Sequence, residues 1–205
     1  MSNSNTKTLI VFAKAPVQGQ VKTRLIPEIG ADAATRVYRK LLEQILDISV
    51  DLPDVTGELW CSGDIDGKCA AYAKQHGMSL HQQEGADLGE RMHLAFESVL
   101  QRCDRAVLIG SDSPEFDGDY LQAAFRALEE KDAVVGPAED GCYLLIGLKK
   151  PEPHLFRQIT WSTNTVMAQT RSRLNELSLS WHELPVKRDI DEPQDLAQFP
   201  QLFSD

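Results

Sequence analysis

Three cationic side chains lie close together in one stretch near the amino terminus. Lys14, Lys22 and Arg24 surround Gly19 in the segment KAPVQGQVKTR, which contains no carboxylate. Lysine supplies a point charge and arginine can bind an oxyanion through two hydrogen bonds, so the segment predicts a phosphate-binding loop. It is not a Walker loop, because the first glycine of that motif is missing and Pro27 stands where its helix would begin. The alternative is a solvated basic loop that balances an acidic surface.

A carboxylate follows the apolar run AVLIG near the middle of the chain. Asp112 stands there directly after Ser111, at the point where the expected strand ends. It could cap the next helix, but Asp117 or Asp119 is better placed to cap a helix that starts near Tyr120. Asp112 is therefore predicted to bind a metal ion or a substrate, with Ser111 as a neighbouring nucleotide-binding candidate.

Two more carboxylates occur in the segment DIDEP close to the carboxyl end. In an extended stretch Asp189 and Asp191 project to the same side, so both could face one cation. The alternative is that Asp191 caps a C-terminal helix with Pro193 in its first turn. Hard oxygen ligands without clustered His or Cys favour Mg²⁺ or Mn²⁺, held by Asp112 plus one of this pair and completed by substrate phosphates.

Two loops between the expected elements carry further candidates. The segment GADLGERM opens a helix whose amide groups would attract an anion with help from Arg91, although Asp87 could be only the cap of that helix. In the segment AEDGC, Asp140 could be a turn residue or could contact an acceptor hydroxyl. Cys142 is a weak candidate for a nucleophile, because no histidine lies near it in the sequence.

The remaining histidines and cysteines form no recognisable site. The five histidines are dispersed, and the G-x-S-x-G motif of serine hydrolases is absent around Ser111. The four cysteines form no C-x-x-C pair, which argues against structural zinc and predicts reduced, mostly buried thiols. These cysteines are Cys61, Cys69, Cys103 and Cys142.

Short apolar runs alternate with helical patterns along the chain. Strands are predicted at 8–13, 58–61, 79–82, 106–111, 133–136, 143–148 and 180–186, and helices at 31–48, 87–101, 119–130 and 164–177. This alternation implies crossover connections and a mainly parallel sheet covered on both faces, an open α/β sandwich. Ligands of such sheets bind beyond the carboxyl ends of strands, which is where the candidates above occur.

The composition is that of a globular domain with an acidic surface. The chain has 205 residues, 42% of them hydrophobic, and a formal charge of −10; residues 1–27 carry +4 and the rest carry −14. The excess of Lys and Arg that non-specific nucleic-acid binding needs is missing, so nucleic acids and acidic membranes are not expected partners. No apolar run is long enough for a signal sequence or a membrane span, and we expect one cytoplasmic domain over residues 1–205.

Six segments, in this order, resemble a family of small glycosyltransferase-like bacterial proteins in the nucleotide-diphospho-sugar transferase superfamily. They are FAKAPVQGQVKTRL, GADLGERM, IGSDSP, VVGPAEDGCYLLIGL, WST at 161–163 and DIDEPQDL. The resemblance covers nearly the whole chain. It implies the GT-A fold, a Rossmann-like three-layer α/β/α sandwich with a mixed, mainly parallel sheet.

The resemblance also implies roles for single residues. Asp112 would be the strand-end metal carboxylate, and Asp191 or, as second choice, Asp189 would be its partner. Lys14, Lys22 and Arg24 would bind the nucleotide phosphates, and Asp87 and Arg91 would lie near the nucleotide. Gly19 and Ser111 are further nucleotide-binding candidates. Four positions depart from the family pattern without removing any of these candidates: Gln18, Gln20, Cys142 and Gln194.

Three functions are compatible with these features. The first is a metal-dependent transferase that takes a sugar from a nucleoside-diphosphate sugar, with Lys22 and Asp140 as catalytic candidates. The second is nucleotidyl transfer from a nucleoside triphosphate to a phosphorylated acceptor, as in the guanylyltransferases of the same superfamily. The third is a nucleotide-binding module without turnover. The expected ligands are a nucleotide or nucleotide sugar, Mg²⁺ or Mn²⁺ and a small acceptor; a homodimer is compatible with the sequence, which leaves base, sugar and acceptor open.

Overall fold

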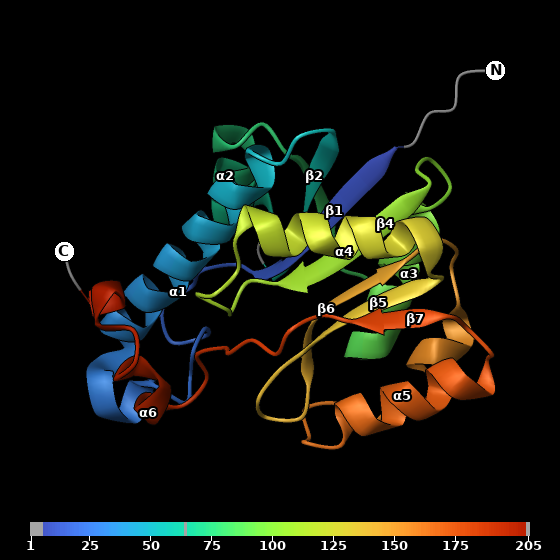
Figure 1. The fold of residues 1–205 in the computed structure, drawn as a ribbon. Coiled ribbons are helices and arrows are strands. Elements are labelled where there is room, and N and C mark those ends of the chain that lie inside the picture. Colours follow the sequence, from blue (N-terminus) through green and yellow to red (C-terminus); the bar gives the residue numbers. More distant parts are fainter. Residues whose placement is uncertain (1–5, 64, 204–205) are drawn as a thin grey trace.

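One seven-stranded sheet forms the middle of the computed structural model, which describes residues 6–63 and 65–203 (Figure 1). The strands are β1 (Lys7–Lys14), β2 (Val55–Ser62), β3 (Ser79–Gln82), β4 (Arg105–Gly110), β5 (Ala133–Pro137), β6 (Tyr143–Leu148) and β7 (Trp181–Glu183). Their order across the sheet is β3-β2-β1-β4-β6-β5-β7, and among the described strands only β6 runs antiparallel to its neighbours. The predicted strands and the mixed, mainly parallel sheet are confirmed.

Helices connect most of these strands. They are α1 (Ile26–Val50), α2 (Ala70–Gln75), α3 (Leu88–Val99), α4 (Gly118–Glu130), α5 (Val166–Glu176) and α6 (Pro193–Leu196). Helix α1 is interrupted at Gly30, where φ is 79° and the backbone is not helical, so its long part begins after Gly30 as predicted and a short first turn with Pro27 precedes it. Helix α2 was not predicted, since six residues are too few to show an apolar period. Within the described ranges, no helix has the length and apolarity that crossing a bilayer requires.

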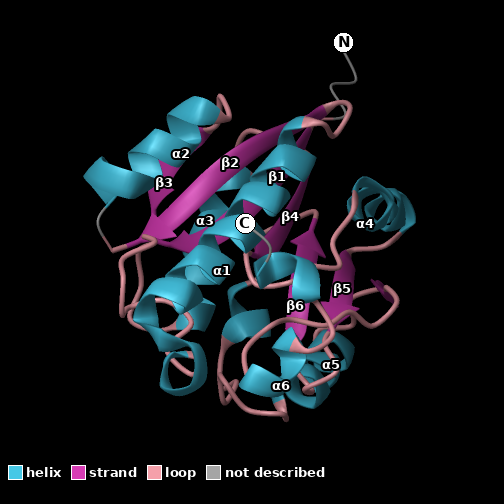
Figure 2. Ribbon diagram, turned by 90° about the vertical axis from the view of Figure 1, so that its left-hand side faces the viewer, coloured by secondary structure: helices cyan, strands magenta, loops and turns pink. Residues whose placement is uncertain are grey.

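Apolar clusters fill both faces of the sheet. Side chains of β1 point alternately into the two clusters, Leu9 and Val11 into one and Ile10 and Phe12 into the other. Helices α1, α2 and α4 cover the first face, and α3 and α5 cover the second; in Figure 2 the sheet lies between α4 and α3. Burial of both faces explains why the central strands are continuous apolar runs. The predicted three-layer sandwich is confirmed.

The C-terminal segment packs on the first helix. A third apolar cluster joins Leu25 and Val37 to Ile190 and Leu196, and all four side chains are buried. In Figure 1 the red end of the chain lies beside the blue start of α1. This packing carries the end of the chain back to the carboxyl edge of the first strand.

Two of the four cysteines are paired. Cys61, at the end of β2, and Cys69, in the turn before α2, form a disulfide, whereas Cys103 and Cys142 are free thiols. The prediction of four reduced cysteines is therefore wrong for Cys61 and Cys69, although both are buried as expected. The spacing gave no sign of this pair, because the two side chains meet only when the turn after β2 folds back on that strand.

Candidate functional site

The predicted candidates gather at one edge of the sheet. The carboxyl ends of β1, β4, β5 and β7 lie at the same edge because these strands are parallel, and the antiparallel strand β6 begins there. The chain passes from β1 to β2 on one side and later returns to β4 on the other side. The gap between β1 and β4 is thus the topological switch point, where open α/β sheets form their ligand crevice.

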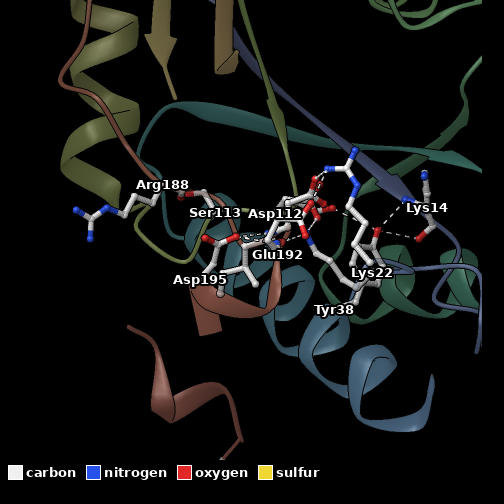
Figure 3. Close-up of polar contacts among 12 residues, drawn as sticks. Lys14, Lys22, Tyr38, Asp112, Ser113, Arg188, Glu192 and Asp195 are labelled. Carbon is white, nitrogen blue, oxygen red and sulfur yellow. Dashed lines mark hydrogen bonds and ion pairs between the residues drawn. The ribbon is translucent and has the colours of Figure 1, made fainter. Parts of the chain in front are cut away.

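Lys22 lies at the centre of this edge (Figure 3). Its Nζ is 2.5 Å from Asp112 Oδ1 and donates to the carbonyl oxygen of Ile190, also at 2.5 Å. Only 4% of the Lys22 side chain is exposed, against 46% of the Asp112 side chain. A buried ammonium group needs such a counter-charge. The pair therefore joins the basic loop after β1 to the end of β4 and to the C-terminal segment.

Arg24 pairs with the C-terminal carboxylates. Its Nη1 contacts Asp191 and lies 3.5 Å from Glu192 Oε1. The N–H groups of Asp191 and Glu192 both donate to Asp195 Oδ2, at 3.0 and 2.7 Å. Glu192, and not Asp191, is the cap of α6, so the alternative in which Asp191 caps this helix is wrong. The cap moves by one residue because Pro193 occupies the first helical position.

A pocket of about 290 Å³ lies beside these pairs. Carboxylates outnumber guanidinium groups in its lining, which includes Arg24, Glu139, Asp140, Arg188, Asp189, Asp191, Glu192 and Asp195. Burial raises the pKa of Asp189 to about 6, the charge of Asp140 raises it as well, and Lys22 acts in the opposite direction. Asp189 is thus electrostatically coupled to Asp140 and Asp112, whereas Asp191 is neutralised by Arg24.

The chemistry of this donor set suits Mg²⁺ or Mn²⁺. No group of three His, Cys, Asp or Glu side chains forms a preformed metal site in the part of the chain that the structure describes. Such an ion needs only one or two protein carboxylates when substrate phosphates complete its shell. Asp112 is half exposed, and Asp189 lies among negative charges that a cation would offset. The residues fit the ion, and both Asp189 and Asp191 stay candidates for the second position, because the exposed Arg24 can exchange its contact with Asp191.

Tyr38 of α1 belongs to this edge, although it is not among the site residues predicted from the sequence. Its hydroxyl accepts the Lys14 N–H at 2.7 Å, donates to the Lys14 carbonyl at 3.0 Å and accepts from Ser111 Oγ at 3.3 Å. Ser111 is buried by these contacts, whereas the Lys14 side chain is exposed. One feature of the sequence could have indicated this role: Tyr38 lies among the apolar positions of its helix, and a buried tyrosine hydroxyl requires a hydrogen-bond partner.

The other predicted nucleotide contacts lie farther from Asp112 in the hydrogen-bond network. Asp87 caps α3 by accepting the Glu90 N–H at 2.8 Å, which is the alternative that the sequence left open. Arg91 Nε donates to the Gly85 carbonyl at 3.2 Å and so shapes the loop before α3. Gly19 is exposed in a turn of the basic loop, where its φ of 80° favours glycine. The structure joins none of these three to Asp112 by a direct contact.

The architecture is that of the nucleotide-diphospho-sugar transferases. A proposed nucleotide-diphospho-sugar transferase from Desulfovibrio desulfuricans G20 is 32% identical, with a TM-score of 0.85 over 91% of this chain and 82% of that chain. The 4-diphosphocytidyl-2C-methyl-D-erythritol synthase of Anaerococcus prevotii DSM 20548 is 11% identical, with a TM-score of 0.63 over 96% and 95%. Glucosyl-3-phosphoglycerate synthase from Mycobacterium tuberculosis, in complex with Mn²⁺, UDP and glucosyl-3-phosphoglycerate, is 14% identical, with a TM-score of 0.60 over 95% and 75%. At these identities, the similarity to the last two proteins shows the fold alone.

The chain belongs to the DUF2064 family, described as an uncharacterized protein conserved in bacteria, whose model matches residues 45–163. No curated protein sequence is significantly similar to it. The resemblance drawn from the six sequence segments is therefore confirmed at the level of family and fold.

Proposed function

We propose that this protein is a metal-dependent transferase that moves a sugar from a nucleoside-diphosphate sugar to a small acceptor. The observation that carries the proposal is the contact of buried Lys22 with Asp112 at the switch point of the sheet, with Asp189 and Asp140 close by. Cations for phosphate and carboxylates for a divalent ion thus come together at one crevice. The similarity to the proposed nucleotide-diphospho-sugar transferase of Desulfovibrio desulfuricans supports the same class of donor.

In the proposed reaction, the bond between the anomeric carbon and the diphosphate oxygen breaks, and that carbon forms a bond to the acceptor oxygen. The acceptor hydroxyl gives its proton to Asp140, and the nucleoside diphosphate leaves. A divalent cation, when bound by Asp112 and either Asp191 or Asp189, would neutralise charge on the diphosphate. Lys22 uses two of its three N–H groups on Asp112 and Ile190, which leaves one for a phosphate oxygen.

Arg24 would also bind phosphate, by exchanging its contact with Asp191 for one with the donor. Its side chain is 57% exposed, so this ion pair is weak and the exchange costs little. The other proposed nucleotide contacts are Lys14, Gly19, Asp87, Arg91 and Ser111. Ser111 adjoins Asp112 in the chain, and the hydroxyl of Tyr38 links the Ser111 side chain to the backbone of Lys14.

A second candidate is nucleotidyl transfer, in which a phosphorylated acceptor attacks a nucleoside triphosphate and pyrophosphate leaves. The fold similarity to 4-diphosphocytidyl-2C-methyl-D-erythritol synthase supports this alternative. The pocket lining favours the first proposal, because its excess of carboxylates would repel a phosphorylated acceptor more than an uncharged one. The third candidate is a nucleotide-binding module without turnover.

The test begins with thermal shifts of the protein in the presence of nucleotides and nucleotide sugars, with and without Mn²⁺. A stabilising donor is then incubated with candidate acceptors, and the products are separated by ion-exchange chromatography. Release of a nucleoside diphosphate supports glycosyl transfer. Release of pyrophosphate contradicts glycosyl transfer and supports nucleotidyl transfer. Stabilisation without any product supports the binding module. A protein that no nucleotide stabilises would contradict all three.

We expect Asp112→Asn to weaken Mn²⁺-dependent nucleotide binding at least tenfold in calorimetry, because an amide is a poor ligand for this ion. Asparagine removes the counter-charge of Lys22 but keeps an oxygen that accepts from its ammonium group, whereas alanine would remove the charge and the acceptor together. The control is Asp117→Asn at the cap of α4, where asparagine caps equally well and binding stays unchanged. An affinity of the Asp112→Asn variant within twofold of the wild type would contradict the metal assignment.

A further inference from the structure

The pairing of β1 with β4 stops before the site. Its register ends with Phe12 opposite Gly110, although β1 continues to Lys14. The next residue along, Ala15, donates its N–H to the Ser62 carbonyl after β2. Because successive residues of a strand direct their backbone groups to opposite neighbours, the N–H and C=O of Lys14 point to the β4 side, where no strand residue follows. Unpaired, these two groups would be costly to bury.

The hydroxyl of Tyr38 takes the place of the missing strand residue. It accepts the Lys14 N–H and donates its one proton to the Lys14 carbonyl, and its remaining lone pair accepts from Ser111 Oγ. Tyr38 is 3% exposed, so little water competes for these bonds. Burial raises the pKa of Tyr38 above its ordinary value, and the charge of Asp112 adds to the effect, so the hydroxyl keeps the proton that it donates.

We propose that Tyr38 is a positioning residue of the site, whose hydroxyl holds the ends of β1 and β4 apart and so sets the width of the crevice at the switch point. Lys14 opens the basic loop on one side of this hydroxyl (Figure 3), and Ser111 precedes Asp112 on the other. The link from Tyr38 to ligand binding rests on the proposed function, because it assumes that Asp112 and the basic loop bind a metal–diphosphate.

Because Asp112 follows Ser111 in the chain, a change in the position of Ser111 would move Asp112 and its contacts with the rest of the site. Its carboxylate contacts Lys22, and its carbonyl accepts the Ile190 N–H at 3.1 Å. A shift of the β4 end would therefore change the distance between the metal carboxylate and the basic loop without touching either side chain. Loss of the Tyr38 hydroxyl removes the bond that fixes this distance.

The first measurement uses Tyr38→Phe, which deletes the hydroxyl and keeps the ring in the core. Binding of pyrophosphate with Mn²⁺ is measured by calorimetry, because the diphosphate is common to both proposed reactions and needs no knowledge of the base. We expect the affinity to fall at least tenfold. The control is Ser49→Ala on the same helix, which deletes an equally buried hydroxyl bonded to the Ile45 carbonyl, far along α1 from the sheet edge. It should bind within twofold of the wild type.

The second measurement is amide hydrogen exchange and chemical shift by NMR. In Tyr38→Phe the Lys14 amide should exchange at least tenfold faster, and the amides of Ser111 and Asp112 should shift, whereas Ser49→Ala leaves all three as in the wild type. Faster exchange with unchanged affinity would make Tyr38 merely structural and overturn the proposal, as would unchanged exchange. If the wild-type protein binds no Mn²⁺–pyrophosphate, the proposed function fails, and the exchange rates and shifts alone decide whether Tyr38 positions this edge.

Discussion

Glu58 is a carboxylate on β2 with 1% of its side chain exposed. Arg102 holds it by two hydrogen bonds, one of them 2.9 Å from Nη2 to Oε2, and Trp60 Nε1 donates to it at 3.1 Å. Burial alone would raise the pKa of Glu58, but the hydrogen bonds from Arg102 and Trp60 outweigh burial and lower it. The charged carboxylate is therefore favoured by the folded state.

The stability of the protein should depend on the protonation of Glu58. A lowered folded-state pKa contributes stability that is present above the unfolded-state pKa of about 4.5 and is lost as the pH falls through the lower folded-state pKa. We expect the free energy of unfolding in urea to fall between pH 5 and pH 3, and less steeply in Glu58→Gln. Glu183→Gln, which breaks a more exposed pair with Arg171, should flatten the curve less. Parallel curves for wild type and Glu58→Gln would contradict this role.

Residue types alone indicated much of the site chemistry, but they did not indicate pairing. Strand-end position made Asp112 a candidate, and lack of nearby carboxylates did the same for Lys22. The direct contact between Lys22 and Asp112 joins residues from two separate loops, so no local pattern contains it. The role of Tyr38 was hidden for the same reason, because its partners lie on two strands that are adjacent only in the sheet.

At the scale of elements, the start of α3 depends on a close approach to another segment. Gly89 is buried near the helix start, and a Cβ there would lie 2.7 Å from the Phe156 carbonyl oxygen and 2.7 Å from the ring of Trp161. These distances are too short for a side chain. Packing therefore explains the second glycine of GADLGERM, a segment for which the sequence left an anion-binding helix start and a simple Asp87 cap as alternatives.

We expect Gly89→Ala to lower the free energy of unfolding by about 1–3 kcal/mol, because the added methyl group must push α3 away from Trp161. The control is Gly118→Ala in the first turn of α4, where the nearest atom to a Cβ outside that helix would be Leu52 Cδ2, at 3.9 Å. Alanine there should be neutral or stabilise by up to about 1 kcal/mol. Urea midpoints at constant slope give both values, and equal midpoints for the two variants would refute the packing argument.

Strands and the Asp117 cap of α4 were predicted better than short helices and the cap of α6. Each apolar run became a strand because both faces of this sheet are covered, and that burial is visible in the sequence itself. Helix α2 and the cap of α6 depend on one or two turns whose signals are too short to interpret alone. The Cys61–Cys69 disulfide depends on such a turn as well.

At the scale of the whole molecule, the C-terminal segment completes the edge that the first strand begins. Ile190 is fully buried against Leu25 and Val37, its N–H donates to the Asp112 carbonyl, and its carbonyl accepts from Lys22. One residue thus links the apolar packing of the tail to the polar contacts of the site. Changes in that packing should reach the site through the backbone.

Ile190→Ala is expected to cost about 2–5 kcal/mol of stability and also to weaken Mn²⁺–pyrophosphate binding, because the emptied space lets the segment with Asp189 shift. Leu174→Ala on α5 removes an equally buried side chain from the other face of the sheet and serves as the control. It should cost a similar free energy of unfolding and leave binding within twofold of the wild type. Binding is measured by calorimetry well below the melting temperatures of both variants. Equal affinities would show that packing of the C-terminal segment does not affect the site.

The sequence by itself determined the layers, the strand positions and the types of chemical group that follow each strand. These properties are local, because a run of residues carries its own burial pattern and each loop carries its own charges. Only the tertiary structure decided which groups meet. It paired Lys22 with Asp112 and Arg24 with Asp191, brought Asp189 and Asp140 into the lining of one pocket, and inserted Tyr38 between two strand ends. The physical reason is that these contacts depend on strand order and on the return of the chain end, which no window of neighbouring residues encodes.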